Sequence, residues 1–186
     1  MNIIKPILTW AGAAIVITSL SSCSSSSNLT QQTAAPPNAQ ERKIAERVFS
    51  LVNAERAKAG KKAFRGNRNL NKMAQQHSSF QASSHLTKGK PSNFGSHNRA
   101  QYAYLKYGIE NLGEIESAVP ASNSDPARTA VNAWMKSAEH NRHLKQSWDL
   151  TGVGVHKANN KYYITMMVGV RPSGVPRSVR PGSIYH

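Results

Sequence analysis

Apolar residues recur at helical spacing in the first half of the chain. Between Glu41 and Gly60, one face carries Ile44, Val48, Leu51 and Val52 while charges lie opposite, which predicts a helix that stops at Gly60. Residues 69–86 repeat the pattern and predict a second helix, whose apolar face holds Leu70, Met73, Ala74, His77 and Phe80. We expect His77 at the edge of the core. Residues 99–108 predict a short tyrosine-rich helix closed at Gly108.

The second half of the chain changes from helical to strand-like spacing. Residues 124–140 predict a helix with Ser124 or Asp125 as cap and Pro126 in its first turn. Its apolar face consists of Ala127, Ala130, Val131, Trp134 and Met135. Residues 150–157 and 161–170 are rich in β-branched and aromatic residues, and the asparagines between them favour a tight hairpin turn. On the strand-like run before the helix, we expect Glu114 and Glu116 to form a solvated face.

Several helices followed by a late hairpin predict an α+β fold, with helices covering a small antiparallel sheet. The length of 186 residues is enough for one domain with a core, and we place it at residues 41–172. We expect residues 173–186 to be a basic C-terminal tail.

The first 22 residues have the shape of an export signal. Lys5 precedes an apolar run of 14 residues from Ile7 to Leu20, which is shorter than the roughly twenty residues of a membrane-spanning helix. The run ends in LSSC, which resembles the lipobox of bacterial lipoproteins, so we expect residues 1–22 to be a lipoprotein signal peptide and Cys23 to be acylated. The alternatives are a free thiol or an uncleaved signal anchor. Residues 23–40, with Cys23 and then Ser, Gln, Thr and Pro, predict a disordered tether.

The net charge of +15, from 24 basic and 9 acidic residues, would attract nucleic acid, anionic lipid or acidic envelope polymers alike. The basic residues are mostly isolated along the chain, and the aromatic residues lie mainly at core-like positions. This pattern does not favour a nucleic-acid surface.

Six segments in order, LVNAERAKAG, NFGSH, YGIENLGE, AVNAWMKSAEHNRHL, LTGVGV and KYYITMMVG, resemble the bacterial branch of the CAP superfamily. This SCP-like extracellular domain is shared by cysteine-rich secretory proteins, antigen 5 and plant pathogenesis-related proteins. The resemblance covers about residues 43–170. It implies a three-layer α-β-α sandwich with a surface groove and requires no disulfide.

The resemblance also implies a groove tetrad of two histidines and two glutamates, which sometimes holds a divalent metal. His97 and Glu110 match the first histidine and glutamate, and Asn111 follows Glu110 as in the family. Ser137 stands where the second glutamate would lie, and the last strand has no matching histidine. The W-M-x-S-x-G-H pattern of bacterial relatives is met by Trp134, Met135, Ser137 and His140, with Glu139 replacing the glycine, so His140 would supply the missing imidazole.

These residues leave several hypotheses open. His97, Glu110 and His140 would form a three-ligand metal site for zinc or another divalent ion, although no cofactor is required. Ser137, His140 and Glu110 would instead imitate a hydrolase triad, if Ser137 and His140 are neighbours on a continuous helix. As packing alone, Ser137 and His140 would hold the helix end while His143 faces solvent. As a ligand groove, the set would be His97, Glu110, Asn111, Ser137 and His140.

We therefore expect an exported lipoprotein, anchored through Cys23 to the outer membrane or the cell surface. It would bind a ligand or envelope component, such as an anionic polymer, a peptide or a lipid, in a polar groove. The alternatives are a metal-assisted or serine-dependent hydrolase of peptide, ester or envelope polymer, and a lipid- or sterol-binding protein.

Overall fold

The computed structural model describes residues 34–84 and 96–171. It contains five helices, α1 (Ala39–Lys58), α2 (Arg68–Ser84), α3 (Ser96–Tyr107), α4 (Pro126–Lys136) and α5 (Ala138–Leu144), and four strands, β1 (Arg65–Gly66), β2 (Glu110–Pro120), β3 (Leu150–Ala158) and β4 (Lys161–Val170). The expected signal peptide, Cys23, most of the tether and the basic tail lie outside the described residues. No helix of the described part has the length and apolar character needed to cross a bilayer.

The strands form one sheet in the order β1-β3-β4-β2. The long strands β2, β4 and β3 pair antiparallel, and β3 and β4 form the expected hairpin. Its turn residues Asn159 and Asn160 have φ values of 49° and 60°, the left-handed region that asparagine tolerates. The sheet is mixed, because the two-residue strand β1 pairs parallel to β3. A strand this short leaves no periodic pattern in the sequence.

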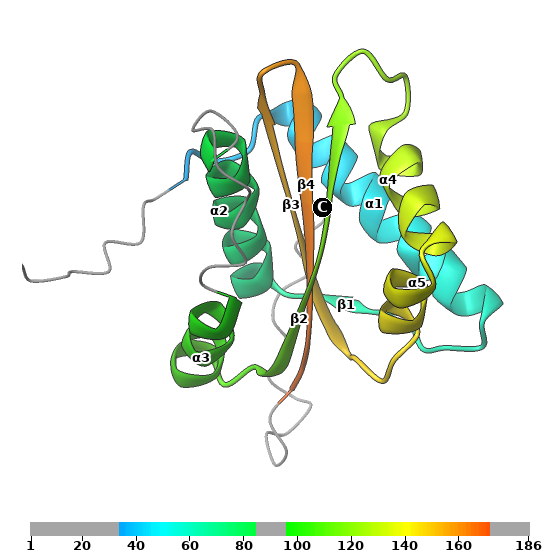
Figure 1. Ribbon diagram of the computed structural model, residues 1–186. Helices are drawn as coiled ribbons and strands as arrows, with labels where there is room; N and C mark the ends of the chain where they lie inside the picture. The colour runs from blue at the N-terminus through cyan, green and yellow to red at the C-terminus, as the bar shows by residue number, and fades with distance from the viewer. Residues whose placement is uncertain (1–33, 85–95, 172–186) are drawn as a thin grey trace, which may run out of the picture. The chain divides into compact units, whose positions relative to one another are not determined.

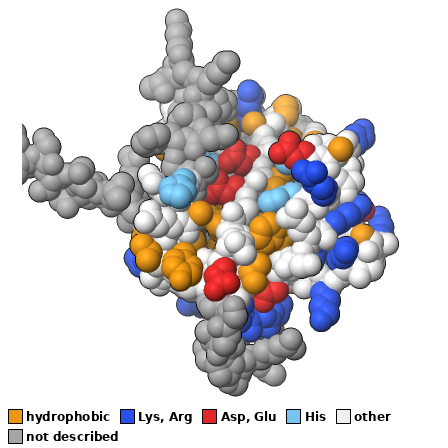
Figure 2. Space-filling model, turned by 60° about the horizontal axis from the view of Figure 1, so that its bottom comes forward, with side chains coloured by type: hydrophobic (Ala, Val, Ile, Leu, Met, Phe, Trp, Pro, Cys, Tyr) orange, Lys and Arg blue, Asp and Glu red, His pale blue; other side chains and the backbone are white. Residues whose placement is uncertain are grey.

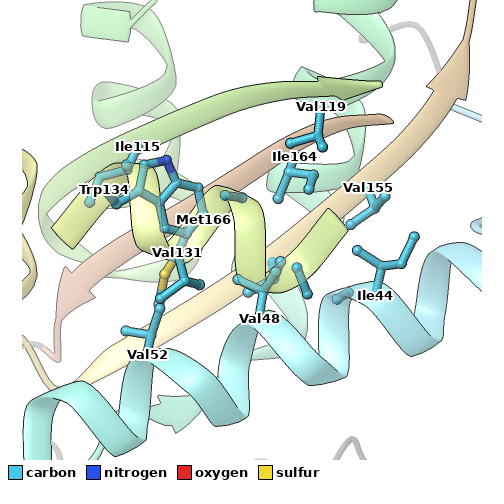
Figure 3. Close-up of a cluster of buried hydrophobic side chains, with 14 of the residues drawn as sticks. Ile44, Val48, Val52, Ile115, Val119, Val131, Trp134, Val155, Ile164 and Met166 are labelled. Atoms are coloured by element: carbon cyan, nitrogen blue, oxygen red, sulfur yellow. The ribbon is translucent and has the colours of Figure 1, made fainter. Parts of the chain in front are cut away.

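The helices lie on both faces of the sheet, so the expected three-layer sandwich is confirmed (Figure 1). Helices α2 and α3 cover one face, and α1, α4 and α5 cover the other. The larger core lies between the sheet and the α1 and α4 layer, where Val48, Ile115, Trp134, Ile164 and Met166 pack together (Figure 3). A smaller core lies beneath α2 and α3.

Helix α1 begins at Ala39, two residues before the expected domain start. Asn38 accepts a hydrogen bond from the backbone of Glu41, and the Glu41 side chain accepts one from the backbone of Asn38. This reciprocal capping box satisfies two otherwise free donors and fixes the helix start. Near the other end of α1, the buried guanidinium of Arg56 donates to the carbonyls of Lys62, Leu144 and Gln146. It thereby joins the end of α1 to the loop after α5.

The helix expected over residues 124–140 is two helices. Asp125 caps α4, as expected, and Pro126 occupies its first turn. The helix then ends at Lys136, because Ser137 adopts extended backbone angles (φ −78°, ψ 118°) and serves as the N-cap of α5. The expectation of a continuous helix through His140 is therefore wrong. The apolar residues keep their spacing up to Ser137 and beyond it, so the sequence pattern does not show that one helix ends at this serine and another begins.

Candidate functional site

A group of polar side chains lies on the face of the sheet covered by α2 and α3. We call it the His77 cluster, and it consists of His77 and Gln81 from α2, Arg99 from α3, and Glu114 and Glu116 from β2. The two glutamates are two residues apart on a strand, so their side chains leave the sheet on the same face. Figure 2 shows acidic and histidine side chains gathered near the middle of one surface, with most lysines and arginines toward one side.

Two ion pairs connect the members of the His77 cluster. Arg99 donates two hydrogen bonds to Glu114, from Nε to Oε1 at 2.6 Å and from a terminal nitrogen to Oε2 at 2.5 Å. His77 Nε2 forms a short hydrogen bond with Glu116 Oε1, and the Gln81 amide nitrogen lies 3.3 Å from the same ring nitrogen. His77 is 6% exposed. The side chains of Glu114 and Arg99 are 14% and 20% exposed, so that pair is largely removed from water, whereas the Glu116 side chain is 36% exposed and remains accessible to solvent.

The charge of Glu116 is stabilised by its neighbours. Burial alone would raise the pKa of Glu116, but the hydrogen bond and the charge of His77 outweigh burial and hold that pKa below its usual value. Gln81 and Arg99 act in the same direction. Glu116 is therefore ionised at neutral pH, and its Oε1 accepts a hydrogen bond from the imidazole of His77.

The backbone of the cluster is held from the opposite face of the sheet. Trp134 of α4 is 1% exposed, and its indole nitrogen donates to the carbonyl oxygen of Glu116 at 3.0 Å. Its ring lies beside Ile115 and Val131 (Figure 3). The tryptophan of the W-M-x-S segment thus fixes the strand that carries both glutamates.

The donor set fits a divalent cation. One ligand atom each from His77, Glu114 and Glu116 lie within 4.8 Å of one another, and no other such group of three occurs among residues 34–84 and 96–171. An imidazole with two carboxylates is a combination that zinc accepts. Two features oppose a cation: Arg99 occupies both oxygens of Glu114, and His77 Nε2 already shares a proton with Glu116. A metal would have to displace that proton.

The structure places the expected metal ligands apart from this cluster. His97 is exposed in the first turn of α3, and Glu110 is the first residue of β2, opposite Val170 on β4. His140 is half-buried on α5. Their three ligand atoms do not form a group of the kind found at His77. The expected neighbour Asn111 is exposed at a β-bulge between Glu110 and Gly113, with a φ of 51°. A metal at His97, Glu110 and His140 stays a prediction.

Ser137 has a structural contact that the triad hypothesis did not anticipate. Its hydroxyl oxygen accepts a hydrogen bond from the backbone N–H of His140 at 3.4 Å, as expected of an N-cap. The contact joins the serine to the histidine backbone and not to its ring. The hydrolase hypothesis on Ser137, His140 and Glu110 stays a prediction.

His143 differs from its expected solvent-facing position. Its ring packs against Trp148 with centroids 5.1 Å apart, and a Cβ built on Gly113 would lie only 2.3 Å from its Nε2. Burial and the nearby His140 lower the pKa of His143, so the ring is neutral at physiological pH. It fills the space that Gly113 leaves beside the β-bulge.

Sequence reasoning missed the His77 cluster. The apolar spacing of α2 indicated a core histidine, and the glutamates of β2 were expected to be solvated. One sequence feature could have indicated the cluster: Glu114 and Glu116 are two residues apart on a strand, and the chain has only nine acidic residues. Phe80, expected on the apolar face, is 43% exposed, and its ring stacks on His77 with centroids 6.1 Å apart.

Comparisons with known proteins support the fold. The family profile described as CAP, cysteine-rich secretory protein family, matches residues 49–170. The structure resembles an outer surface protein of Borrelia burgdorferi, with a TM-score of 0.57 and 19% identity, over 73% of this chain and 96% of that one. It also resembles an extracellular SCP-domain protein of Bacillus anthracis, with a TM-score of 0.52 and 20% identity, over 74% of this chain and 45% of that one. A cysteine-rich secretory protein of Staphylococcus aureus gives a TM-score of 0.51 and 20% identity over 73% and 41%. No curated protein sequence matches the chain.

Proposed function

The chain belongs to the cysteine-rich secretory protein family, and on that premise we propose that it is an exported, lipid-anchored CAP-domain protein that binds a ligand at the His77 cluster. A divalent cation, with zinc as the test ion, is the ligand that this donor set favours. The observation that carries the proposal is the convergence of one imidazole and two carboxylates from α2 and β2. Charges that are largely withdrawn from water, as in the Arg99–Glu114 pair, are costly to maintain, and such groups cluster at functional sites.

The export part of the proposal rests on the N-terminal sequence. The apolar run of residues 7–20 and the LSSC segment support a cleaved signal and acylation of Cys23. Two of the similar structures are an outer surface protein and an extracellular protein, which agrees with export. Labelling of cells with a radioactive fatty acid tests it: we expect label in the protein, lost in Cys23→Ser. Label retained in that variant would place the lipid elsewhere and refute the anchor.

In the metal site, His77 and Glu116 would be the principal ligands, and Glu114 would contribute an oxygen only after Arg99 releases it. A bound divalent ion would supply a positive centre that polarises a ligand oxygen. Two features of the chain would determine how tightly the site binds the ion. His77 and Glu116 hold a proton between them, and Arg99 adds positive charge next to a carboxylate.

Zinc calorimetry on the purified full-length protein tests the proposal, with the three variants His77→Gln, Arg99→Gln and His140→Ala. We expect one saturable site that is lost in His77→Gln. We expect tighter binding in Arg99→Gln, because a competing cation is removed, and unchanged binding in His140→Ala. Titration in two buffers of different ionisation enthalpy measures whether the proton between His77 Nε2 and Glu116 is released when zinc binds.

Two results would contradict this assignment. Binding lost in His140→Ala but kept in His77→Gln would move the metal to the set of His97, Glu110 and His140. Weaker zinc binding in Arg99→Gln would show that Arg99 supports the site, contrary to the electrostatic reasoning. Circular dichroism spectra and melting curves of each variant distinguish a lost site from a lost fold.

A further inference from the structure

A separate pocket of about 420 Å³ lies where the segment leading into α1 meets α2. We call it the β3-edge pocket. Residues 34–37 and the first turns of α1 form one wall, α2 forms the other, and Val153 of β3 belongs to the lining. Figure 1 shows the segment that leads into α1 passing α2. The volume is within the usual range of about 300–1,000 Å³ for small-ligand sites.

The pocket exists because β1 ends early. β1 pairs with β3 only at Leu150 and Thr151, so the following residues of β3 form an open edge. Side chains take the place of a neighbouring strand there. The backbone N–H of Val153 donates to Asn71 Oδ1 at 2.9 Å, and that of Val155 donates to Gln75 Oε1 at 3.0 Å. The edge donors are satisfied, so a ligand at this edge must be recognised by side chains and not by strand addition.

The charges around the β3-edge pocket favour an anion. Arg42, Arg68 and Lys72 line it, and Glu46 is the one acidic lining residue. None of the three cations forms a salt bridge with a carboxylate of the described residues. Arg42 donates instead to the carbonyl of Pro37 at 2.5 Å, which holds the wall of the pocket in place.

One lining residue also carries a hydrogen-bond donor without an acceptor. Gln75 is 7% exposed, and its Oε1 is used by the N–H of Val155. That contact fixes which amide atom is oxygen, and the remaining Nε2 is buried with no hydrogen-bond partner among the described residues. Buried polar groups of this kind normally have a partner. An oxygen of a bound molecule would satisfy it.

We propose that the β3-edge pocket binds a short acidic peptide composed of small residues. Its carboxylates would pair with Arg68 and Lys72, and one carbonyl oxygen would accept from Gln75 Nε2. Its methyl groups would contact the small apolar lining residues, such as Ala45 and Val153. Inorganic phosphate would meet the cations but leave the apolar walls unused. A peptide supplies the charge, the carbonyl and the methyl groups together.

The test is calorimetry of the purified full-length protein with the peptide N-acetyl-Ala-Glu-Ala, whose two carboxylates are matched against N-acetyl-Ala-Gln-Ala-amide and inorganic phosphate. We expect binding of the acidic peptide only. Arg68→Gln and Lys72→Gln should each weaken it by about two- to fivefold, as for ion pairs at exposed positions. Gln75→Glu keeps the acceptor for Val155 but replaces the donor by a charge, and should weaken binding at least about tenfold.

The control is Lys136→Gln, the same charge change at an exposed position on α4 that does not line the pocket. It should leave the affinity of the peptide unchanged. Equal weakening by Lys136→Gln would show that only net charge matters and would overturn the proposal. The same holds if the amide peptide or phosphate binds as tightly as the acidic peptide, or if Gln75→Glu, with its fold intact, binds it as well as the unchanged protein.

Discussion

The hydrogen bond from Trp134 to the carbonyl of Glu116 connects the main core to the His77 cluster, and Trp134→Phe tests it. The substitution removes the indole N–H and leaves a cavity of about 40 Å³, which costs about 1 kcal/mol at roughly 24 cal/mol per Å³. The lost hydrogen bond, made at 3.0 Å by a side chain that is 1% exposed, adds about 1 kcal/mol. We expect a total destabilisation of about 2 kcal/mol.

Urea denaturation followed by circular dichroism measures this loss, and thermal melting should show a decrease in Tm of about 6–10 °C for a domain of this size. The reference variant is Trp148→Phe, because Trp148 also donates its indole N–H, at 2.9 Å, but to the carbonyl of His143. We also expect weaker zinc binding in Trp134→Phe, since the strand carrying Glu116 is no longer fixed. A loss below about 0.5 kcal/mol, with zinc affinity unchanged, would refute the reasoning.

Three further predictions concern the framework. Asp125 has its pKa lowered to about 2, first by the hydrogen bond from Arg47, so its contribution to stability is complete above pH 4 and is lost as the pH falls toward 2. Asp125→Asn should remove that part of the acid dependence in urea denaturation at stepped pH; an unaltered profile would contradict it. Arg56→Met should lower the free energy of unfolding by about 3 kcal/mol in the same assay, because it leaves buried carbonyls without a charged donor. An unchanged free energy of unfolding would show that Arg56 does not stabilise the fold through these carbonyls. Gly154→Ala should cost about 3 kcal/mol, because the new Cβ would lie 2.2 Å from the backbone carbon of Ala74, and a fully stable variant would show that α2 can move away.

The parts of the fold that local chemistry determines could be predicted from the sequence. The apolar face of α1, the cap and proline at the start of α4 and the asparagine turn between β3 and β4 all express preferences of neighbouring residues. The break at Ser137 could not be recognised, because the apolar pattern continues through it. β1 has only two residues and depends on pairing with a strand far along the chain.

The candidate site was harder to predict, because it depends on tertiary contacts. His77 and Glu116 are 39 residues apart and come from a helix and a strand that only the folded domain brings together. Taken alone, each has an ordinary explanation, as a core-edge histidine and a surface glutamate. The family resemblance directed attention to His97, Glu110 and His140, whose positions in the fold do not form a close group of ligand atoms.

X-ray absorption spectroscopy at the zinc edge of the zinc-loaded full-length protein tests the central claim most directly, because it counts imidazole ligands. A site of His77, Glu114 and Glu116 contains one histidine, whereas a site of His97, Glu110 and His140 contains two. We predict a spectrum of one imidazole nitrogen with oxygen ligands, and its loss in His77→Gln. A spectrum with two imidazoles, or a protein that takes up no zinc, would contradict the assignment of the His77 cluster as a metal-binding site.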